Sequence, residues 1–200
     1  MTPATNALPF KAMASFRTFT VDEYDRLIDT GFLTKSDRVE LLEGYVVHKL
    51  PSNLPRDFSV SAVGDLFTRV ILSGWVIRCQ AGARLTQSRP EPDIAIARGP
   101  LRSYASRHPG PADLGLVVEV SESSLDRDQQ DKTRIYARDT IPVYWVVNLV
   151  DRRVEVHTDP TGPGDNPRYH TLRVFPSGAT VPVELDGVTV GTVPVDDLMP

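Results

Sequence analysis

Three residues have the types and the spacing for chemistry on a phosphate ester: Asp93, Glu119 and Lys132. Each carboxylate interrupts an apolar run that is typical of a buried strand, and the lysine follows on the next expected helix. An ionised carboxylate in such surroundings is costly unless it is paired, hydrogen-bonded or bound to a metal. Together the three residues predict a divalent-metal site for phosphodiester chemistry.

Magnesium is the metal that this set of residues favours. It prefers oxygen ligands and keeps several waters, so two or three protein carboxylates suffice. A bound metal would polarise the phosphate and lower the pKa of a bound water, and Lys132 would stabilise charge on the phosphate or orient that water. The ordinary alternative is that Asp93 and Glu119 pair with arginines at strand ends while Lys132 is solvated. The combination of all three favours the site.

Other polar residues are placed to support this site. Ser121 lies two positions after Glu119 and therefore on the same face of the strand. Asp128, Lys132 and Tyr136 are spaced i, i+4, i+8 and share one helix stripe. In the functional interpretation Asp128 and Tyr136 orient Lys132. In the alternative they form a surface salt bridge beside a core tyrosine.

The remaining candidate residues carry no recognisable site. The four histidines have no metal-ligand spacing, and His157 is expected to face solvent from a strand. Cys79 lacks a partner motif and is expected in the core. Trp145 and Tyr144 are expected to pack the sheet.

The elements that must position the site follow from the hydrophobic pattern. Thr20 and Glu23 form a capping box at the start of a helix that Gly31 ends. The pattern then predicts a hairpin over 38–47, a helix over 57–74, strands at 75–79, 83–86 and 92–97, and a loop over 99–113. After this loop it predicts a strand at 116–121, a helix over 124–138, and strands at 142–148 and 153–157. Short strands are expected near 169–175, 181–184 and 187–190. This order indicates an α/β (α+β) fold with a mixed sheet flanked by helices and extra hairpins.

Composition limits the classes of protein. With 200 residues, 40% of them hydrophobic, we expect one domain over 18–200 after a lead-in over 1–17. The net charge of −4 argues against a protein that coats nucleic acid, although acidic metal sites lower such totals. A single cysteine excludes an intramolecular disulfide, and no apolar run approaches the ~18 residues of a membrane span. We therefore expect a cytoplasmic protein without a membrane partner.

Six motifs, in order, resemble one known family. They are Phe19–Tyr24, Arg38–Gly44, Glu91–Ile94, Leu116–Ser121, Asp128–Tyr136 and Pro142–Val147. The chain resembles the Uma-two family of restriction-endonuclease-like proteins, within the PD-(D/E)xK nuclease superfamily. The resemblance covers roughly residues 18–158 and, more weakly, the tail. No single motif decides it, but their order and spacing are specific.

The resemblance implies a restriction-endonuclease-like αβββαβ core, a magnesium-dependent nuclease site that acts on DNA, and a homodimer. Manganese would substitute for magnesium. The resemblance places the metal carboxylates at Asp93 and Glu119. The superfamily commonly carries a lysine two residues after the glutamate, where this chain has Ser121, and the resemblance implies that Lys132 takes the place of that lysine. It also implies an acidic residue in the first hairpin, for which Glu40 is favoured over Glu43.

The chain departs from the family pattern at three places. Arg56 stands where a histidine is expected, Asp139-Thr140 replaces a glycine at the end of the lysine helix, and 121–124 lacks the usual proline. Because threonine disfavours the left-handed conformation, we expect the helix to end differently or Asp139 to cap it. These departures support an alternative, a catalytically inactive nuclease-fold protein that binds nucleic acid or a partner protein.

Overall fold

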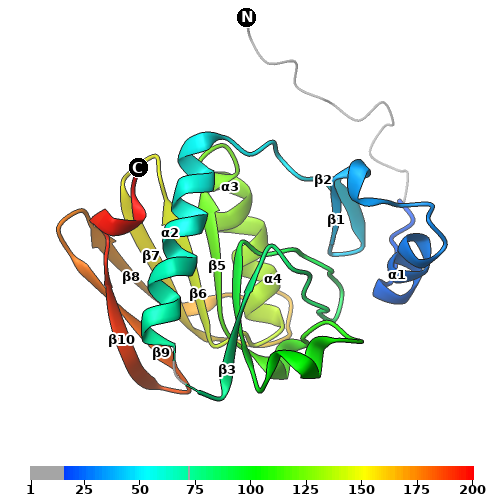
Figure 1. Ribbon diagram of the computed structural model, residues 1–200. Helices are drawn as coiled ribbons and strands as arrows, with labels where there is room; N and C mark the ends of the chain where they lie inside the picture. The colour runs from blue at the N-terminus through cyan, green and yellow to red at the C-terminus, as the bar shows by residue number, and fades with distance from the viewer. Residues whose placement is uncertain (1–15, 72) are drawn as a thin grey trace, which may run out of the picture.

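A six-stranded mixed sheet forms the centre of the molecule (Figure 1). The computed structural model describes residues 16–71 and 73–200, so nearly all of the expected lead-in over 1–17 lies outside the described residues. The strands follow the order β3-β4-β5-β6-β7-β8, and only β5 and β6 pair in parallel. Their bounds are β3 Trp75–Cys79, β4 Ile94–Arg98, β5 Leu114–Ser121, β6 Val143–Asn148, β7 Arg153–Pro160 and β8 Tyr169–Pro176. This architecture confirms the expected fold class.

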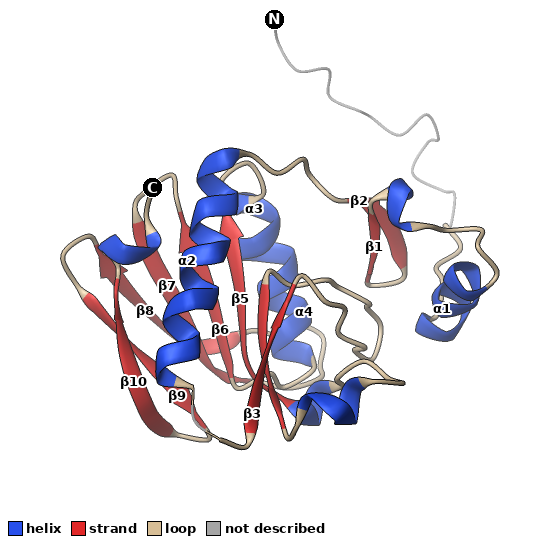
Figure 2. Ribbon diagram, in the orientation of Figure 1, coloured by secondary structure: helices blue, strands red, loops and turns tan. Residues whose placement is uncertain are grey.

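Helices cover both faces of this sheet (Figure 2). Helix α2 (Leu54–Val70) and the hairpin of β9 (Thr180–Leu185) and β10 (Val188–Pro194) cover one face, where Phe67 and Trp145 belong to the larger core. The connection from β5 to β6 covers the other face. There Tyr136 and Tyr144 belong to a second core. In the described part of the chain, no helix is long and apolar enough to cross a membrane.

The central strand β5 shows why the sequence pattern is readable. All eight of its residues are buried, since the strand has neighbours on both edges and cover on both faces. Such a strand needs an apolar side chain at almost every position rather than at alternate ones. The buried carboxylate of Glu119 is therefore an exception that calls for specific partners.

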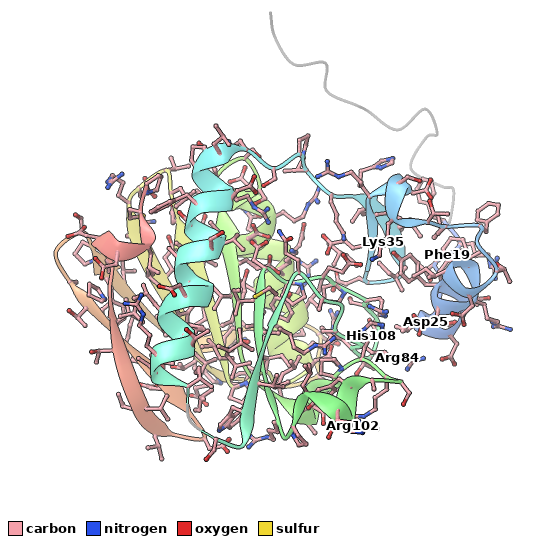
Figure 3. All side chains as sticks on the ribbon, in the orientation of Figure 1. Phe19, Asp25, Lys35, Arg84, Arg102 and His108 are labelled. Atoms are coloured by element: carbon pink, nitrogen blue, oxygen red, sulfur yellow. The ribbon has the colours of Figure 1, made fainter. Side chains whose placement is uncertain are left out.

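A small N-terminal unit lies beside the sheet. It contains α1 (Val21–Asp29), a 3₁₀ turn at Lys35–Asp37, and the hairpin of β1 (Val39–Leu42) and β2 (Tyr45–His48). Thr20 and Glu23 form the predicted capping box. Asp25 attaches this unit to the core, with Oδ2 3.0 Å from Nε of Arg84 and Oδ1 3.1 Å from Nε of Arg89. Figure 3 shows Asp25 and Arg84 on facing segments.

The predicted helix over 124–138 is interrupted by a wide turn. It consists of α3 (Leu125–Arg127), a π-helical turn at Asp128–Lys132, and α4 (Thr133–Arg138). Two hydroxyl groups donate to the carbonyl of Asp128, Thr133 Oγ1 and Tyr144 Oη, both at 3.0 Å. These donors compete with the regular helical hydrogen bond to this carbonyl, which accounts for the wide turn.

Two predicted elements differ in the structure. Helix α2 ends at Val70 rather than at residue 74, and it begins at Leu54 rather than at residue 57 because the Asn53 side chain accepts a hydrogen bond from Arg56 N at 3.1 Å and so caps the helix. Residues 83–86 form no strand. Their backbone groups bond to loops instead, as Leu85 N does to Ser88 O at 2.9 Å. The loop over 99–113 is confirmed, with 3₁₀ turns at Leu101–Tyr104 and Pro111–Asp113, and a last 3₁₀ turn lies at Asp196–Leu198.

Four residues also differ from expectation. His157 is buried, stacked on the ring of Tyr144 with 5.6 Å between centroids. Cys79 is exposed because it ends β3, which lies at the edge of the sheet. Thr140 does adopt the left-handed conformation, with φ +55°. Asp139 does not cap its own helix, since its carboxylate accepts from Thr86 N at 2.8 Å. Trp145 and Tyr144 pack the sheet as expected.

Candidate active site

The pairing of β4 with β5 brings Asp93 and Glu119 together. Ile94 is opposite Val118, so Asp93, one residue before β4, lies beside Glu119 and on the same face. Asp93 Oδ2 accepts a hydrogen bond from Val120 N at 2.8 Å, which ties the aspartate to β5. Both side chains are only 2% exposed. The two residues expected to hold a metal therefore line one pocket.

Glu119 carries the most perturbed carboxyl group of the site. Burial raises its pKa to about 8, the nearby Lys132 opposes the rise, and the charges of Asp128 and Asp93 add to it. Tyr136 Oη donates to Glu119 Oε1 at 2.8 Å, and Lys132 Nζ lies 2.9 Å from the same oxygen. Without a further cation, the carboxyl group holds a proton at neutral pH.

Lys132 comes from the π-helical turn and is surrounded by carboxylates. Its Nζ lies 2.9 Å from Glu119 Oε1, 3.5 Å from Asp128 Oδ1 and 3.8 Å from Glu40 Oε1. Burial opposes the charge, but these three carboxylates outweigh it and raise the pKa of Lys132. The lysine is therefore a fixed ammonium group and not a general base.

Ser121 and Asp128 support the lysine. Ser121 Oγ donates to Asp128 Oδ2 at 2.7 Å, and Ser124 Oγ donates to the same oxygen at 2.6 Å. Ser121 thus fixes Asp128, the acidic neighbour of Lys132. Asp128 Oδ1 is buried and accepts no hydrogen bond within the described residues, with Lys132 as its neighbour.

Of the two hairpin acids, Glu40 reaches the site. It is 3% exposed, and its Oε2 accepts from Glu91 N at 3.3 Å. Glu43 instead binds Arg134 at 2.5 Å and Arg138 at 2.6 Å, which lowers its pKa. The structure therefore places Glu40 in the pocket and Glu43 outside it.

Arg56 belongs to the site, although in the sequence it stands out only as a departure from the expected pattern. Its Nη2 lies 2.6 Å from Asp93 Oδ1, and its Nε donates to Val120 O at 3.0 Å. Burial raises the pKa of Asp93, and Arg56 opposes that rise. The only signal for Arg56 in the sequence was its position, where the family carries another basic side chain.

The pocket around these residues has a volume of about 670 Å³ and is basic at its rim. Seven lysines and arginines line it against five carboxylates. Four of the carboxylates, Glu40, Asp93, Glu119 and Asp128, are those buried around Lys132 and Arg56. The basic residues farther out include Lys35, Arg38 and Arg127, which have no ion-pair partner within 4 Å in the described chain. Lys35 and His108 both line this pocket, and Figure 3 shows that they come from separate segments.

The donor set fits a divalent cation in charge. If all four buried carboxylates are ionised, their negative charges outnumber the positive charges of Lys132 and Arg56 by two. In addition, Glu119 Oε2 accepts no hydrogen bond from a described residue. Across residues 16–71 and 73–200, no three Asp, Glu, His or Cys side chains already converge as a metal centre. A metal with two carboxylate ligands and several waters is compatible with that geometry.

Comparison with known proteins agrees with this fold. A crystal structure from Anabaena variabilis ATCC 29413, described as that of "a putative nuclease belonging to DUF820", is similar with a TM-score of 0.66. The two chains are 15% identical, and the match covers 90% of this chain and 97% of the other. No curated protein matches the chain. The model of the Uma2 family, described as "Putative restriction endonuclease", matches residues 21–191. The expected family is thereby confirmed, and the chain belongs to the Uma2 family.

Proposed function

We propose that this protein is a magnesium-dependent endonuclease that hydrolyses phosphodiester bonds in DNA. The observation that carries the proposal is the excess of buried carboxylates around Lys132 and Arg56 on the floor of a pocket with a basic rim. Membership in the Uma2 family supports a nuclease. The Anabaena protein that shares the fold is described as a nuclease, and this description supports the same class.

Each residue has a role that its surroundings support. Asp93 and Glu119 would hold Mg²⁺ or Mn²⁺, because carboxylate oxygens suit these ions. The metal, when bound, supplies a polarised phosphate and a water of lowered pKa. Lys132 would place its fixed charge beside the phosphate, with Asp128 and Glu40 holding it in position. Tyr136 orients Glu119 through its hydrogen bond.

The basic rim supports DNA as the partner. Lys35, Arg38 and Arg127 are available to phosphate oxygens, which bind lysine and arginine without regard to sequence. Cleavage should therefore weaken with added salt. A homodimer stays a prediction, which light scattering on the purified protein would test.

Substitution of the metal carboxylates tests the proposal. Asp93→Asn and Glu119→Gln should each abolish magnesium-dependent nicking of supercoiled plasmid, and EDTA should abolish it in the wild type. Glu155→Gln is the matched control, since Glu155 is also buried on this face of the sheet but lies outside the pocket. Equal nicking by all four proteins would show that a contaminating nuclease is responsible.

One observation favours the second candidate, a nuclease-fold protein that binds without cutting. Arg56 already neutralises Asp93, as a structural ion pair would. In that case the wild type should bind DNA but cut no substrate with magnesium or manganese, and Asp93→Asn should lower the stability of the fold. Cleavage that depends on Asp93 would exclude this alternative.

A further inference from the structure

Arg56 is held in one geometry by three different acceptors. Besides Asp93 Oδ1 at 2.6 Å and Val120 O at 3.0 Å, its Nη1 donates to Ser52 Oγ at 3.2 Å. The residue lies in the first turn of α2, and its side chain remains 23% exposed to the pocket. The guanidinium is thus fixed against Asp93 and still accessible to a ligand.

A metal and Arg56 compete for the same carboxylate. Asp93 Oδ2 is directed to Val120 N, so Oδ1 is the oxygen left to face the pocket, and Arg56 occupies it. A divalent cation on Asp93 would lie beside a positive guanidinium in a buried place where charges are weakly screened. Tight metal binding therefore requires Arg56 to find another anion.

A phosphate in the pocket supplies that anion. The planar guanidinium matches phosphate oxygens in a bidentate geometry, and such charge-assisted hydrogen bonds are strong. Arg56 and Ser52, which accepts from Arg56 Nη1 at 3.2 Å, both line the pocket, so a phosphate bound there would lie beside the guanidinium. The basic rim brings phosphates to the same place.

From this geometry, which rests on the proposed nuclease function, we propose that Arg56 is a positioning residue that exchanges Asp93 for a substrate phosphate. The divalent metal then binds tightly only when a phosphate ester occupies the pocket. By thermodynamic linkage, the metal raises the affinity for the phosphate ester by the same factor. The metal needed for cleavage is thereby held tightly in the complex with the substrate and not in the free protein.

The exchange is tested by measuring manganese binding by electron paramagnetic resonance, with and without thymidine 3′,5′-bisphosphate. Chelation of manganese by the nucleotide is subtracted from a titration without protein. In the wild type the nucleotide should raise manganese affinity by about 5-fold or more, in the usual range of coupling between sites. In Arg56→Gln, manganese should bind about 5-fold more tightly without the nucleotide, and the nucleotide should change that affinity by less than about 2-fold.

Two further variants control for structure and charge. Arg69→Gln is the matched control, since Arg69 lies on the same helix and pairs with Asp65 at 2.5 Å outside this pocket. It should behave as the wild type. Arg56→Lys keeps the positive charge, so it should still bind manganese weakly when the nucleotide is absent. This variant also tests the proposal if Arg56→Gln does not fold.

The outcomes separate this proposal from the function on which it rests. Manganese binding that Asp93→Asn removes, but that the nucleotide does not change, would overturn the exchange and leave the metal site standing. Weaker manganese binding in Arg56→Gln than in the wild type would also overturn it, because Arg56 would then hold Asp93 ready for the metal. No manganese binding by any of these proteins would refute the metal-dependent function itself.

Discussion

At the scale of single residues, the site is organised around one buried ammonium group. Lys132 contacts Glu119, Asp128 and Glu40, whose carboxylates come from a strand, a helical turn and the N-terminal hairpin. An uncompensated buried charge is far more costly than a neutral polar group. The charge of Lys132 therefore stabilises the metal-free protein, whereas the protonated carboxyl of Glu119 contributes little.

This difference gives a stability prediction. Lys132→Met should lower the free energy of unfolding by about 3–5 kcal/mol, because the buried carboxylates of Asp128 and Glu40 lose their counterion. Glu119→Gln should change it by less than about 1 kcal/mol at neutral pH, since glutamine resembles the protonated carboxyl that the raised pKa implies. Urea unfolding of both variants in EDTA measures the two values. A larger loss in Glu119→Gln than in Lys132→Met would contradict this account of the charges.

The sequence revealed those site residues whose burial is unusual for their type. Asp93 and Glu119 were found because they interrupt apolar runs, and Lys132 because of its spacing after Glu119. Arg56 was missed as a member of the site because its contact with Asp93 depends on where α2 begins, three residues earlier than predicted. The catalytic roles of Glu40, Asp93, Glu119 and Lys132 stay predictions.

At the scale of elements, strands with continuous or alternating apolar residues were predictable, and irregular segments were not. β5 and β6 are buried on both faces, so their composition alone indicates them. The π-helical turn depends on hydroxyl donors from Thr133 and from Tyr144, which is distant in sequence. His157 was misplaced because alternation along β7 does not show that α4 and Tyr169 cover its outer face.

The burial of His157 predicts sensitivity to acid. Burial lowers its pKa below 6.5, Glu155 opposes this, and Nε2 has no partner among the described residues. The unfolded state then binds the proton more readily than the folded state. The stability that neutral His157 contributes is therefore present above a pH of about 6.5 and is lost as the pH falls through the lower pKa of the folded state. His157→Phe should remove this loss of stability in acid. Its gain over the wild type in urea unfolding should grow as pH falls below about 6.5.

An exposed histidine provides the control for this prediction. His170→Phe makes the same substitution at an exposed position on the neighbouring strand β8, so it controls for the loss of a histidine that is not buried. A pH-independent difference between His157→Phe and the wild type would show that His157 is protonated equally in the folded and unfolded states.

At the scale of the whole molecule, the C-terminal hairpin completes the larger core. Val181, Val183 and Leu185 of β9 are buried with Phe67 of α2 and Trp145 of β6. The apolar face of the sheet and the apolar face of the hairpin each need the other, because neither is stable exposed to water. The single domain over 18–200 stays a prediction that this packing supports.

A single domain should unfold as one unit. Leu185→Ala, in a side chain that is 2% exposed, should lower the free energy of unfolding by about 2–5 kcal/mol and shift far-ultraviolet circular dichroism and tryptophan fluorescence together. Leu172→Ala is the matched control, since Leu172 is 54% exposed and should change stability by less than about 0.5 kcal/mol. If Leu185→Ala shifted only a separate early transition, the hairpin would be an independently fraying unit, and the site between α2 and β5 would keep its geometry without it.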